Sequence, residues 1–495
     1  MLSNKYVFPF LAFAVPLLFR AVPEVLMGSY VVGFDTMGHF VPTTMLWLNG
    51  GADLWRCIAT APLFYTFVVS VVASGGPLIT VLKIIPPLLH GFLGLSIYGY
   101  AKIGLNWSPK KSVFTALIAT VYFVALRISW DLLRNELALI FLFVVLTLLA
   151  GGNFGKNLWK RYTLLSVSMI AVVLAHQLVA VIMFGLVVFT VIYMFVRKER
   201  FRAFSLVVTA LPAVLLFFAS VYFIPAVPEF RLIFGFPASS DGWLALFGFS
   251  SYSAMITSEA GFFLYCFLPM LPLVIISAKR FRNFHIQIWV LLIFIASLVP
   301  MVSPSNLRWV MMLTYPFAFY VSEALSRLKS INWRRFRLAA YRFAVVYLVL
   351  STAILSLGFM LMSPEKPFQY FDVEKYNGYI NQIPSSMMQN TVSIADCGDT
   401  VLALQWFKDN TGENAVLLTH RAFYGWALTA LSKDHVILYE YDNPEIDAAT
   451  AVRQGQNQVY LIWWVNGQGW YGQPTVASSF EEVYHSNKIA IYRYK

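Results

Sequence analysis

The chain has 495 residues, of which 59% are hydrophobic and only 12% are charged. Soluble domains are roughly one quarter charged, so this composition excludes an ordinary soluble protein and predicts a chain that lies partly in lipid. The formal charge of +12 could indicate a nucleic-acid partner, but in a membrane protein the position of the basic residues matters more. The three cysteines are far apart and include no Cys-x-x-Cys pair, which argues against a disulfide framework or a zinc site.

Apolar runs of about 17–25 residues are long enough to cross a bilayer, and they predict about eleven transmembrane helices. They lie near residues 7–27, 78–101, 112–128, 137–151, 162–177, 178–196, 203–225, 261–278, 286–302, 308–325 and 339–362. The run at 61–74 is shorter, and we interpret it as a helix that lies on the membrane surface. The first run is too long to resemble a cleaved signal peptide, so we expect it to be retained.

Basic residues predict the orientation of these helices. Alternate loops are strongly basic, at residues 108–111, 155–161, 196–202, 278–284 and 326–337. The positive-inside rule places these loops and the N-terminus in the cytoplasm, and everything after about residue 363 outside. We therefore predict a multi-pass protein of the cell membrane, whose net charge reflects topology and lipid headgroups and not nucleic acid.

From residue 363 the sequence becomes polar and mixed. Residues 401–420 predict an amphipathic helix, a turn and a strand. Further strands are predicted at 435–441, 459–465 and 489–494. The predicted fold is thus an α-helical polytopic membrane module over 1–362, followed by a small extracytoplasmic α/β domain over 363–495.

Ionisable residues gather on the predicted outer side. Because charged groups near lipid are costly, each of them is a candidate functional residue. The candidates are Asp35, His39, Asp131, Arg134, His176 and Arg308. Acids, imidazoles and guanidiniums in one layer are typical of active sites. A long outer loop at 226–260 is expected, together with the C-terminal domain, to choose the acceptor substrate.

Asp35, His39 and Asp131 could each have a structural role instead of a functional one. Asp35 could cap the helix that follows it, act as a general base, or do both. His39 lies one helical turn later and could simply make a structural hydrogen bond. Asp131 could contact a substrate or pair with a neighbouring arginine.

Structural roles also stay open for the remaining three candidates. Arg134 and Arg308 could extend toward lipid headgroups, or they could grip a phosphate bidentately. His176 could be a buried, hydrogen-bonded histidine. A carboxylate beside arginines at the membrane surface suits a lipid-phosphate donor and a hydroxyl acceptor.

Several stretches resemble a known superfamily. GFDTMGHF (33–40), APLFYTFV (61–68) and LKIIPPLLHGFLGLSIYGYAKI (82–103) resemble the start of the GT-C glycosyltransferases. Those enzymes include protein O-mannosyltransferases, aminoarabinose transferases of lipid A and oligosaccharyltransferases. SWDLLRNELALIFLFV (129–144) and ALQWFKDNTGENAVLLTH (403–420) are similar to archaeal members.

The resemblance implies a membrane glycosyltransferase. Such an enzyme moves a sugar, with inversion, from a polyprenyl-phosphate donor of the dolichyl-phosphate type to a hydroxyl on a glycan, lipid or protein at the outer face. By this resemblance Asp35 matches the acid that activates the acceptor and Arg308 matches a donor-phosphate ligand. Arg134 matches the second role less closely, and His176 matches by position only.

Two departures from the superfamily bear on cofactors and acceptors. WWVNG at 463–467 lacks the acid of the WWDYG motif of oligosaccharyltransferases, and SWD at 129–131 is not their acidic metal-binding pair. We therefore expect no obligatory metal and no other cofactor, although metal dependence stays open. A flippase or transporter of lipid-linked glycans, and a glycan polymerase or ligase, stay open as alternatives.

Overall fold

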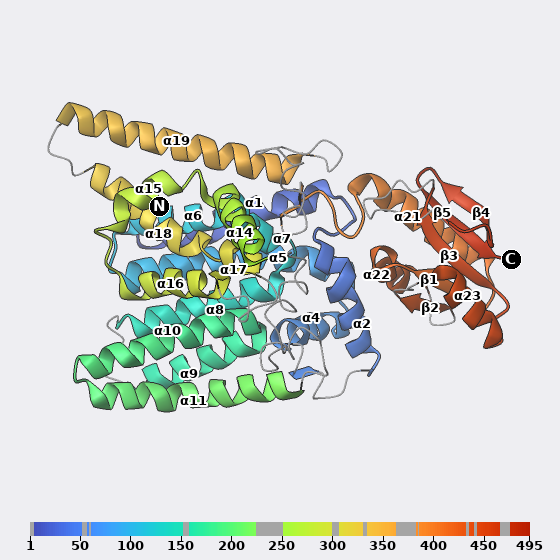
Figure 1. The fold of residues 1–495 in the computed structure, drawn as a ribbon, viewed down its shortest axis with the longest axis horizontal. Helices are drawn as coiled ribbons and strands as arrows, with labels where there is room; N and C mark the ends of the chain where they lie inside the picture. Colours follow the sequence, from blue (N-terminus) through green and yellow to red (C-terminus); the bar gives the residue numbers. More distant parts are fainter. Residues whose placement is uncertain are drawn as a thin grey trace.

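The computed structural model of the protein describes residues 4–51, 57–58, 61–151, 158–223, 251–298, 306–329, 334–362, 383–384, 386–431, 435–439, 443–465 and 476–495. Figure 1 shows a long helical bundle with a smaller domain, containing a β-sheet, beyond one end of it. The C-terminus lies at the far side of this smaller domain (Figure 1).

The bundle is built from helices of very different lengths. In its first half these are α1 (Asn4–Leu26), the π-helical turn η1 (Thr36–Phe40), α2 (Val41–Leu48), α4 (Leu63–Ala73), α5 (Leu78–Gly99), the π-helical turn η2 (Tyr100–Gly104), α6 (Pro109–Val121), α7 (Phe123–Asp131) and α8 (Leu133–Leu149). In its second half they are α9 (Leu158–Ala175), α10 (Gln177–Val196), α11 (Arg200–Phe223), α14 (Tyr252–Phe267), α15 (Leu271–Ala278), α16 (Phe284–Leu298), α17 (Asn306–Met311), α18 (Thr314–Leu328) and α19 (Arg334–Leu361).

Among the described residues, six helices are long and apolar enough to cross a membrane, and two bent helix pairs raise this number to as many as eight. The bent pairs are α6 with α7, at 62°, and α14 with α15, at 95°. These helices confirm the predicted helical membrane-protein fold, whereas the count of eleven spans stays a prediction. The run at 61–74 forms the 11-residue helix α4, which is about 16 Å long and too short to cross a bilayer core of about 30 Å.

Local chemistry explains several helix starts. The Ser108 side chain accepts a hydrogen bond from the Lys111 amide, and Pro109 occupies the first turn, where a missing N–H costs nothing. At the other end of the bundle, the His176 ring caps α10 directly after α9 ends. The chain therefore reverses direction at His176 within one residue.

The smaller domain carries a five-stranded sheet in the order β2-β1-β3-β5-β4. Its strands are β1 (Val416–Thr419), β2 (Val436–Tyr439), β3 (Val459–Trp464), β4 (Phe480–Ser486) and β5 (Ile489–Tyr494). Its helices are α21 (Ile394–Asn410), α22 (Arg421–Ala430) and α23 (Pro444–Arg453). Strand β1 runs parallel to β2 and β3, whereas β5 runs antiparallel to β3 and β4.

The predicted helix, turn and strand at 401–420 and the three predicted strands are confirmed as α21 and β1, β2, β3 and β5. The edge strand β4 was not predicted, because its FEEVYHS sequence has two exposed glutamates directly after its first residue. The predicted domain boundary at residue 362 adjoins residues 363–382, which lie outside the described residues, so it stays a prediction.

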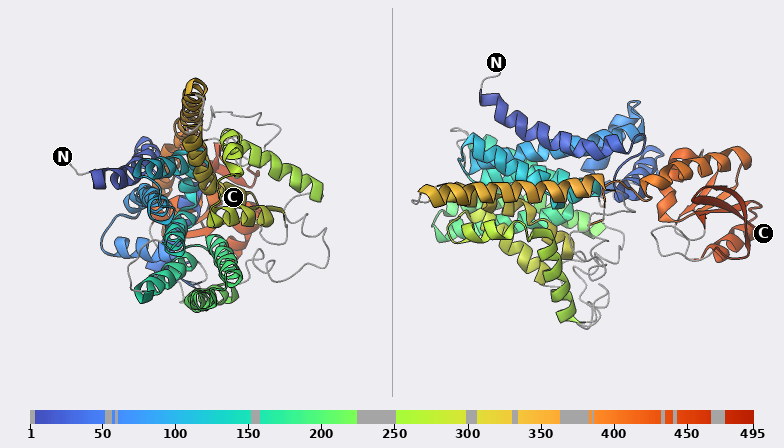
Figure 2. Two further views of the ribbon diagram at one scale, coloured as in Figure 1. Left: turned by 90° about the vertical axis from the view of Figure 1, so that its left-hand side faces the viewer. Right: turned by 90° about the horizontal axis from the view of Figure 1, so that it is seen from above.

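The sheet domain docks on the bundle through α22, which packs against η1 and α2. Figure 2 shows α19 running along the outside of the bundle, with the sheet domain beyond one end. The basic turn between α10 and α11 lies at the opposite end of the bundle (Figure 1). This separation is what the predicted topology requires, and the orientation in a membrane stays a prediction.

Candidate active site

Asp35 stands at the start of η1, which packs against α22 of the sheet domain. Within the described part of the chain, its carboxylate makes no hydrogen bond to the first turn of η1. Asp35 therefore does not cap this helix, which was one of the roles that the sequence left open. Its Oδ1 lies 3.7 Å from Nε2 of His39, and the Asp35 side chain is 21% exposed. The carboxylate is thus held near an imidazole and can still be reached.

The backbone leading to Asp35 is fixed by a close approach. Gly33 has a φ of +101°, and a Cβ at this position would lie 2.1 Å from the Trp130 carbonyl oxygen. Only glycine meets both demands without strain. Three residues further on, the Thr36 hydroxyl donates to the Val32 carbonyl at 2.7 Å. The loop between α1 and η1 therefore packs directly on the end of α7.

Asp131 ends α7, and Arg134 lies in the first turn of α8 just past the break at Leu132. Asp131 is buried and ion-paired with Arg127, one turn earlier on the same helix. This contact resolves the choice of arginine partner. The charge of Asp35 also acts on the Asp131 carboxylate, so the two acids belong to one electrostatic cluster.

Arg134 and His176 lie at the same end of the bundle. The Arg134 guanidinium is 5.8 Å from the centroid of the Tyr65 ring on α4, and both Arg134 and Asp35 act electrostatically on that tyrosine. His176 accepts a hydrogen bond at Nδ1 from the Leu178 amide, 3.1 Å away. An accepting Nδ1 leaves the ring proton on Nε2, so His176 is a neutral hydrogen-bond donor at this position.

Arg308, on the short helix α17, completes the group. The positive charge of Arg308 interacts electrostatically with the side chains of Asp131 and His176, and the charge of Arg134 interacts with the same histidine. Arg308 makes no hydrogen bond or ion pair with any other residue that the structure describes. The structure thus brings the six predicted residues to one end of the bundle, although they come from four separate stretches of sequence.

The cluster carries more positive than negative charge. Arg127, Arg134 and Arg308 face two carboxylates, those of Asp35 and Asp131. Arg127 is ion-paired with Asp131, and the cluster also holds the guanidiniums of Arg134 and Arg308 and the accessible carboxylate of Asp35. Guanidiniums grip phosphate oxygens well, and a partly buried carboxylate can take a proton from a hydroxyl.

Sequence reasoning did not select two contributors to this site. Tyr65 lies on the short helix α4 and was recognised only as part of an interfacial run. Arg421, in the sheet domain, places its guanidinium 5.7 Å from the ring centroid of Phe34, the residue before Asp35. The local sequence could not predict the role of Arg421, because its contact joins residues almost 390 positions apart.

The described residues do not meet the requirements of a metal site. These ranges contain no group of three or more His, Cys, Asp or Glu side chains that could hold a metal ion. Most of the loop at 226–260, which was expected to help choose a substrate, lies outside the described residues because the gap runs from 224 to 250.

No protein-family model matches the chain, and no curated protein matches it. Solved structures do. The chain is similar to ArnT from Cupriavidus metallidurans bound to undecaprenyl phosphate, with a TM-score of 0.57, 12% identity, and coverage of 99% of this chain and 98% of that one. It is also similar to the Archaeoglobus fulgidus oligosaccharyltransferase, with a TM-score of 0.54, 12% identity, and coverage of 94% and 70%.

A third similar structure is the arabinofuranosyltransferase AftD from Mycobacteria, with a TM-score of 0.53 and 15% identity; the match covers all of this chain and 40% of AftD. The chain therefore has the fold of the GT-C glycosyltransferases, as the resemblance of its first loops predicted. At these identities the likeness establishes the architecture alone.

Proposed function

We propose that the chain is a membrane glycosyltransferase that moves a sugar from a polyprenyl-phosphate donor to an acceptor hydroxyl at the outer face of the membrane. One observation carries this proposal. The Asp35 carboxylate is accessible and does not cap η1, and it lies in one cluster with the guanidiniums of Arg134 and Arg308. The ligands of two similar proteins support the donor class. ArnT was solved with undecaprenyl phosphate, and the Archaeoglobus oligosaccharyltransferase AglB with dolichol phosphate and an inhibitory peptide.

The proposed reaction is a single displacement with inversion. Asp35 takes the proton of the acceptor hydroxyl as its oxygen attacks the anomeric carbon of the donor. The bond between that carbon and the phosphate oxygen breaks, and its electron pair leaves on the polyprenyl phosphate. Arg308 and Arg134 stabilise the negative charge that grows on this phosphate, and His176 offers an Nε2–H to the same oxygens. The protonated Asp35 returns its proton to water.

Substitution of Asp35 tests the role of its carboxylate. The Asp35→Asn variant keeps the size of the side chain but cannot act as a base, so we expect transfer to fall at least about 100-fold. The matched control is Asp409→Asn, on the exposed face of α21. The measurement uses purified protein in vesicles with a panel of dolichyl- and undecaprenyl-phosphate hexoses and pentoses, and mass spectrometry of glycosylated acceptors.

Two results would contradict the proposal. Near-normal turnover by the Asp35→Asn variant would remove this residue from the base role. Movement of an intact lipid-linked glycan between leaflets, with no new glycosidic bond, would instead identify a transporter. Mass analysis of glycans and glycolipids from cells that lack the protein would name the acceptor that the vesicle assay should use.

A further inference from the structure

A short segment before α21, residues 387–390, reaches from the sheet domain back to the bundle. We call it the docking segment. The Gln389 carbonyl accepts a hydrogen bond from the Gly33 amide at 3.1 Å, and Asn390 donates through Nδ2 to the Val31 carbonyl at 3.0 Å. The docking segment therefore binds the backbone of the loop at two points, two and four residues before Asp35.

The same segment also binds the end of α7. The Trp130 indole N–H is 3.2 Å from the carbonyl oxygens of both Met387 and Gln389. Trp130 directly precedes Asp131 in the sequence. The docking segment thus contacts the residue directly before Asp131 and the loop that leads to Asp35.

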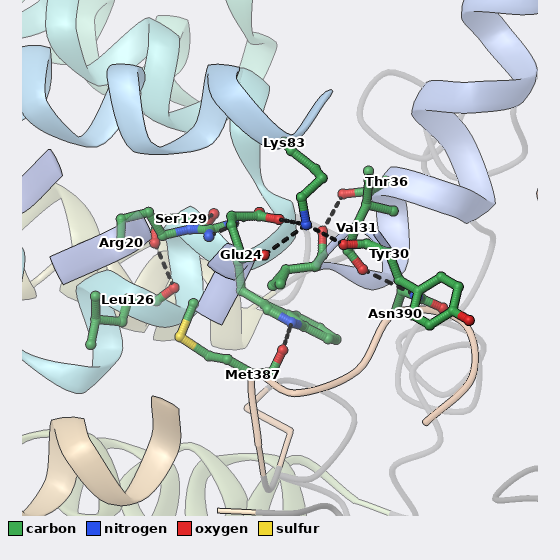
Figure 3. Close-up of polar contacts among 12 residues, drawn as sticks. Arg20, Glu24, Tyr30, Val31, Thr36, Lys83, Leu126, Ser129, Met387 and Asn390 are labelled. Atoms are coloured by element: carbon green, nitrogen blue, oxygen red, sulfur yellow. Dashed lines mark hydrogen bonds and ion pairs between the residues drawn. The ribbon is translucent and has the colours of Figure 1, made fainter. Parts of the chain in front are cut away.

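Lys83 holds the loop from the opposite side. Its Nζ donates to the carbonyls of Glu24, at 2.7 Å, and Tyr30, at 2.5 Å, and lies 3.7 Å from the Glu24 carboxylate. Glu24 is in turn ion-paired with the fully buried Arg20 at 3.0 Å. Figure 3 shows Tyr30 and Val31 between Lys83 on one side and Asn390 on the other. The Lys83 ammonium group therefore has a structural role, since its partners are backbone carbonyls and a buried carboxylate of the protein itself.

We propose that Asn390 is a positioning residue for Asp35, so that the sheet domain sets the geometry of the catalytic loop as well as covering it. This inference rests on the proposed function. Asn390 is fully buried, and its other amide atom is also engaged, because Oδ1 accepts from the Val392 amide at 3.0 Å. The side chain is therefore fixed in the orientation that grips Val31. Burial raises the pKa of the nearby Cys397 thiol to about 12, so this neighbour stays neutral.

The sharpest test exchanges one atom of this residue. The Asn390→Asp variant keeps an oxygen for the Val392 amide and replaces the donor to Val31 with an acceptor. A second variant, Trp130→Phe, removes the indole N–H while keeping a ring in place. Their controls are Thr400→Val and Trp406→Phe, which alter a hydroxyl that bonds within α21 and a ring stacked on Tyr484.

Hydrogen exchange reports the position of the loop without any assay of activity. In the full-length protein in nanodiscs, we expect the amides of residues 31–36 to exchange about tenfold faster in both test variants. The two controls should leave these amides unchanged. Unchanged exchange at 31–36 in a folded Asn390→Asp protein, or in Trp130→Phe if the first variant does not fold, would overturn the proposal.

Kinetics separate positioning from general stability. With a donor of the panel that supports transfer, we expect the Asn390→Asp variant to lose about tenfold or more in kcat while its KM for the donor stays within about twofold. An equal loss of kcat in the Thr400→Val control, at equal thermal stability, would overturn the positioning role of Asn390. The proposed function fails on a different result, full activity of the Asp35→Asn variant, which leaves the exchange measurement informative.

Discussion

At the scale of single residues, a buried pair deep in the bundle shows how hydrogen bonds fix the protonation of a site. His90 on α5 and Glu136 on α8 are both fully buried, with His90 Nδ1 2.5 Å from a Glu136 carboxyl oxygen. Nε2 of the same ring is 2.9 Å from the Thr120 carbonyl oxygen, which can only accept. One proton must therefore lie between the ring and the carboxyl group, and the pair is neutral as a unit.

This reasoning predicts opposite results for two substitutions of Glu136. In the Glu136→Gln variant the amide N–H donates to Nδ1 of a neutral His90, so we expect thermal stability in detergent close to that of the wild type. The Glu136→Leu variant leaves Nδ1 buried without a donor, which should cost about 1–3 kcal/mol. Thermal unfolding of both proteins is the measurement, and equal losses in the two would show that the hydrogen bond is not what matters here.

At the scale of secondary structure elements, the contact between α22 and η1 leaves no room for a side chain at Gly425. A Cβ on Gly425 of α22 would lie 2.0 Å from the carbonyl oxygen of Met37 in η1. Since a backbone oxygen cannot move aside like the end of a side chain, only glycine allows the helix this close. The docking of the sheet domain thus depends on one missing methyl group.

Replacing that glycine by alanine sets two effects against each other. In an isolated helix, glycine to alanine stabilises by about 1 kcal/mol. We expect the Gly425→Ala variant to be destabilised instead and to lose transfer activity, because α22 must lift off η1. The control is Gly398→Ala on α21, where a Cβ would meet the Tyr30 hydroxyl at an ordinary 3.7 Å. A Gly425→Ala protein as stable and as active as the Gly398→Ala protein would contradict this account of the interface.

Elements with a strong local pattern were predictable, and those fixed by distant contacts were not. The apolar runs and the strands at 459–465 and 489–494 carry their own periodicity or β-branched and aromatic content. Helix α22 was missed because RAFYGWALTA begins at a histidine cap and is only ten residues long. The order of the strands was also out of reach, since pairing of β3 with β5 is a property of the whole sheet.

At the scale of the whole molecule, composition predicted the class of protein and topology predicted where to look for a site. Counting helices placed Asp35, Arg134 and Arg308 in one outer layer, and the structure gathers them at the end of the bundle nearest the sheet domain. The support beneath them was not predictable. Asn390 and Val31 are 359 residues apart, and no sequence pattern links a side-chain amide to one particular distant carbonyl.

The proposed function requires that Asp35 and Arg308 serve one lipid-accessible site. Cryo-electron microscopy of the protein in nanodiscs with undecaprenyl phosphate or dolichyl phosphate can locate the phosphate. We expect it within about 2.7–4 Å of the Arg308 guanidinium, on the side that faces Asp35, with Arg134 beside it. A phosphate bound at the basic end of the bundle, or held where Asp35 could not reach a sugar attached to it, would rule out a shared site.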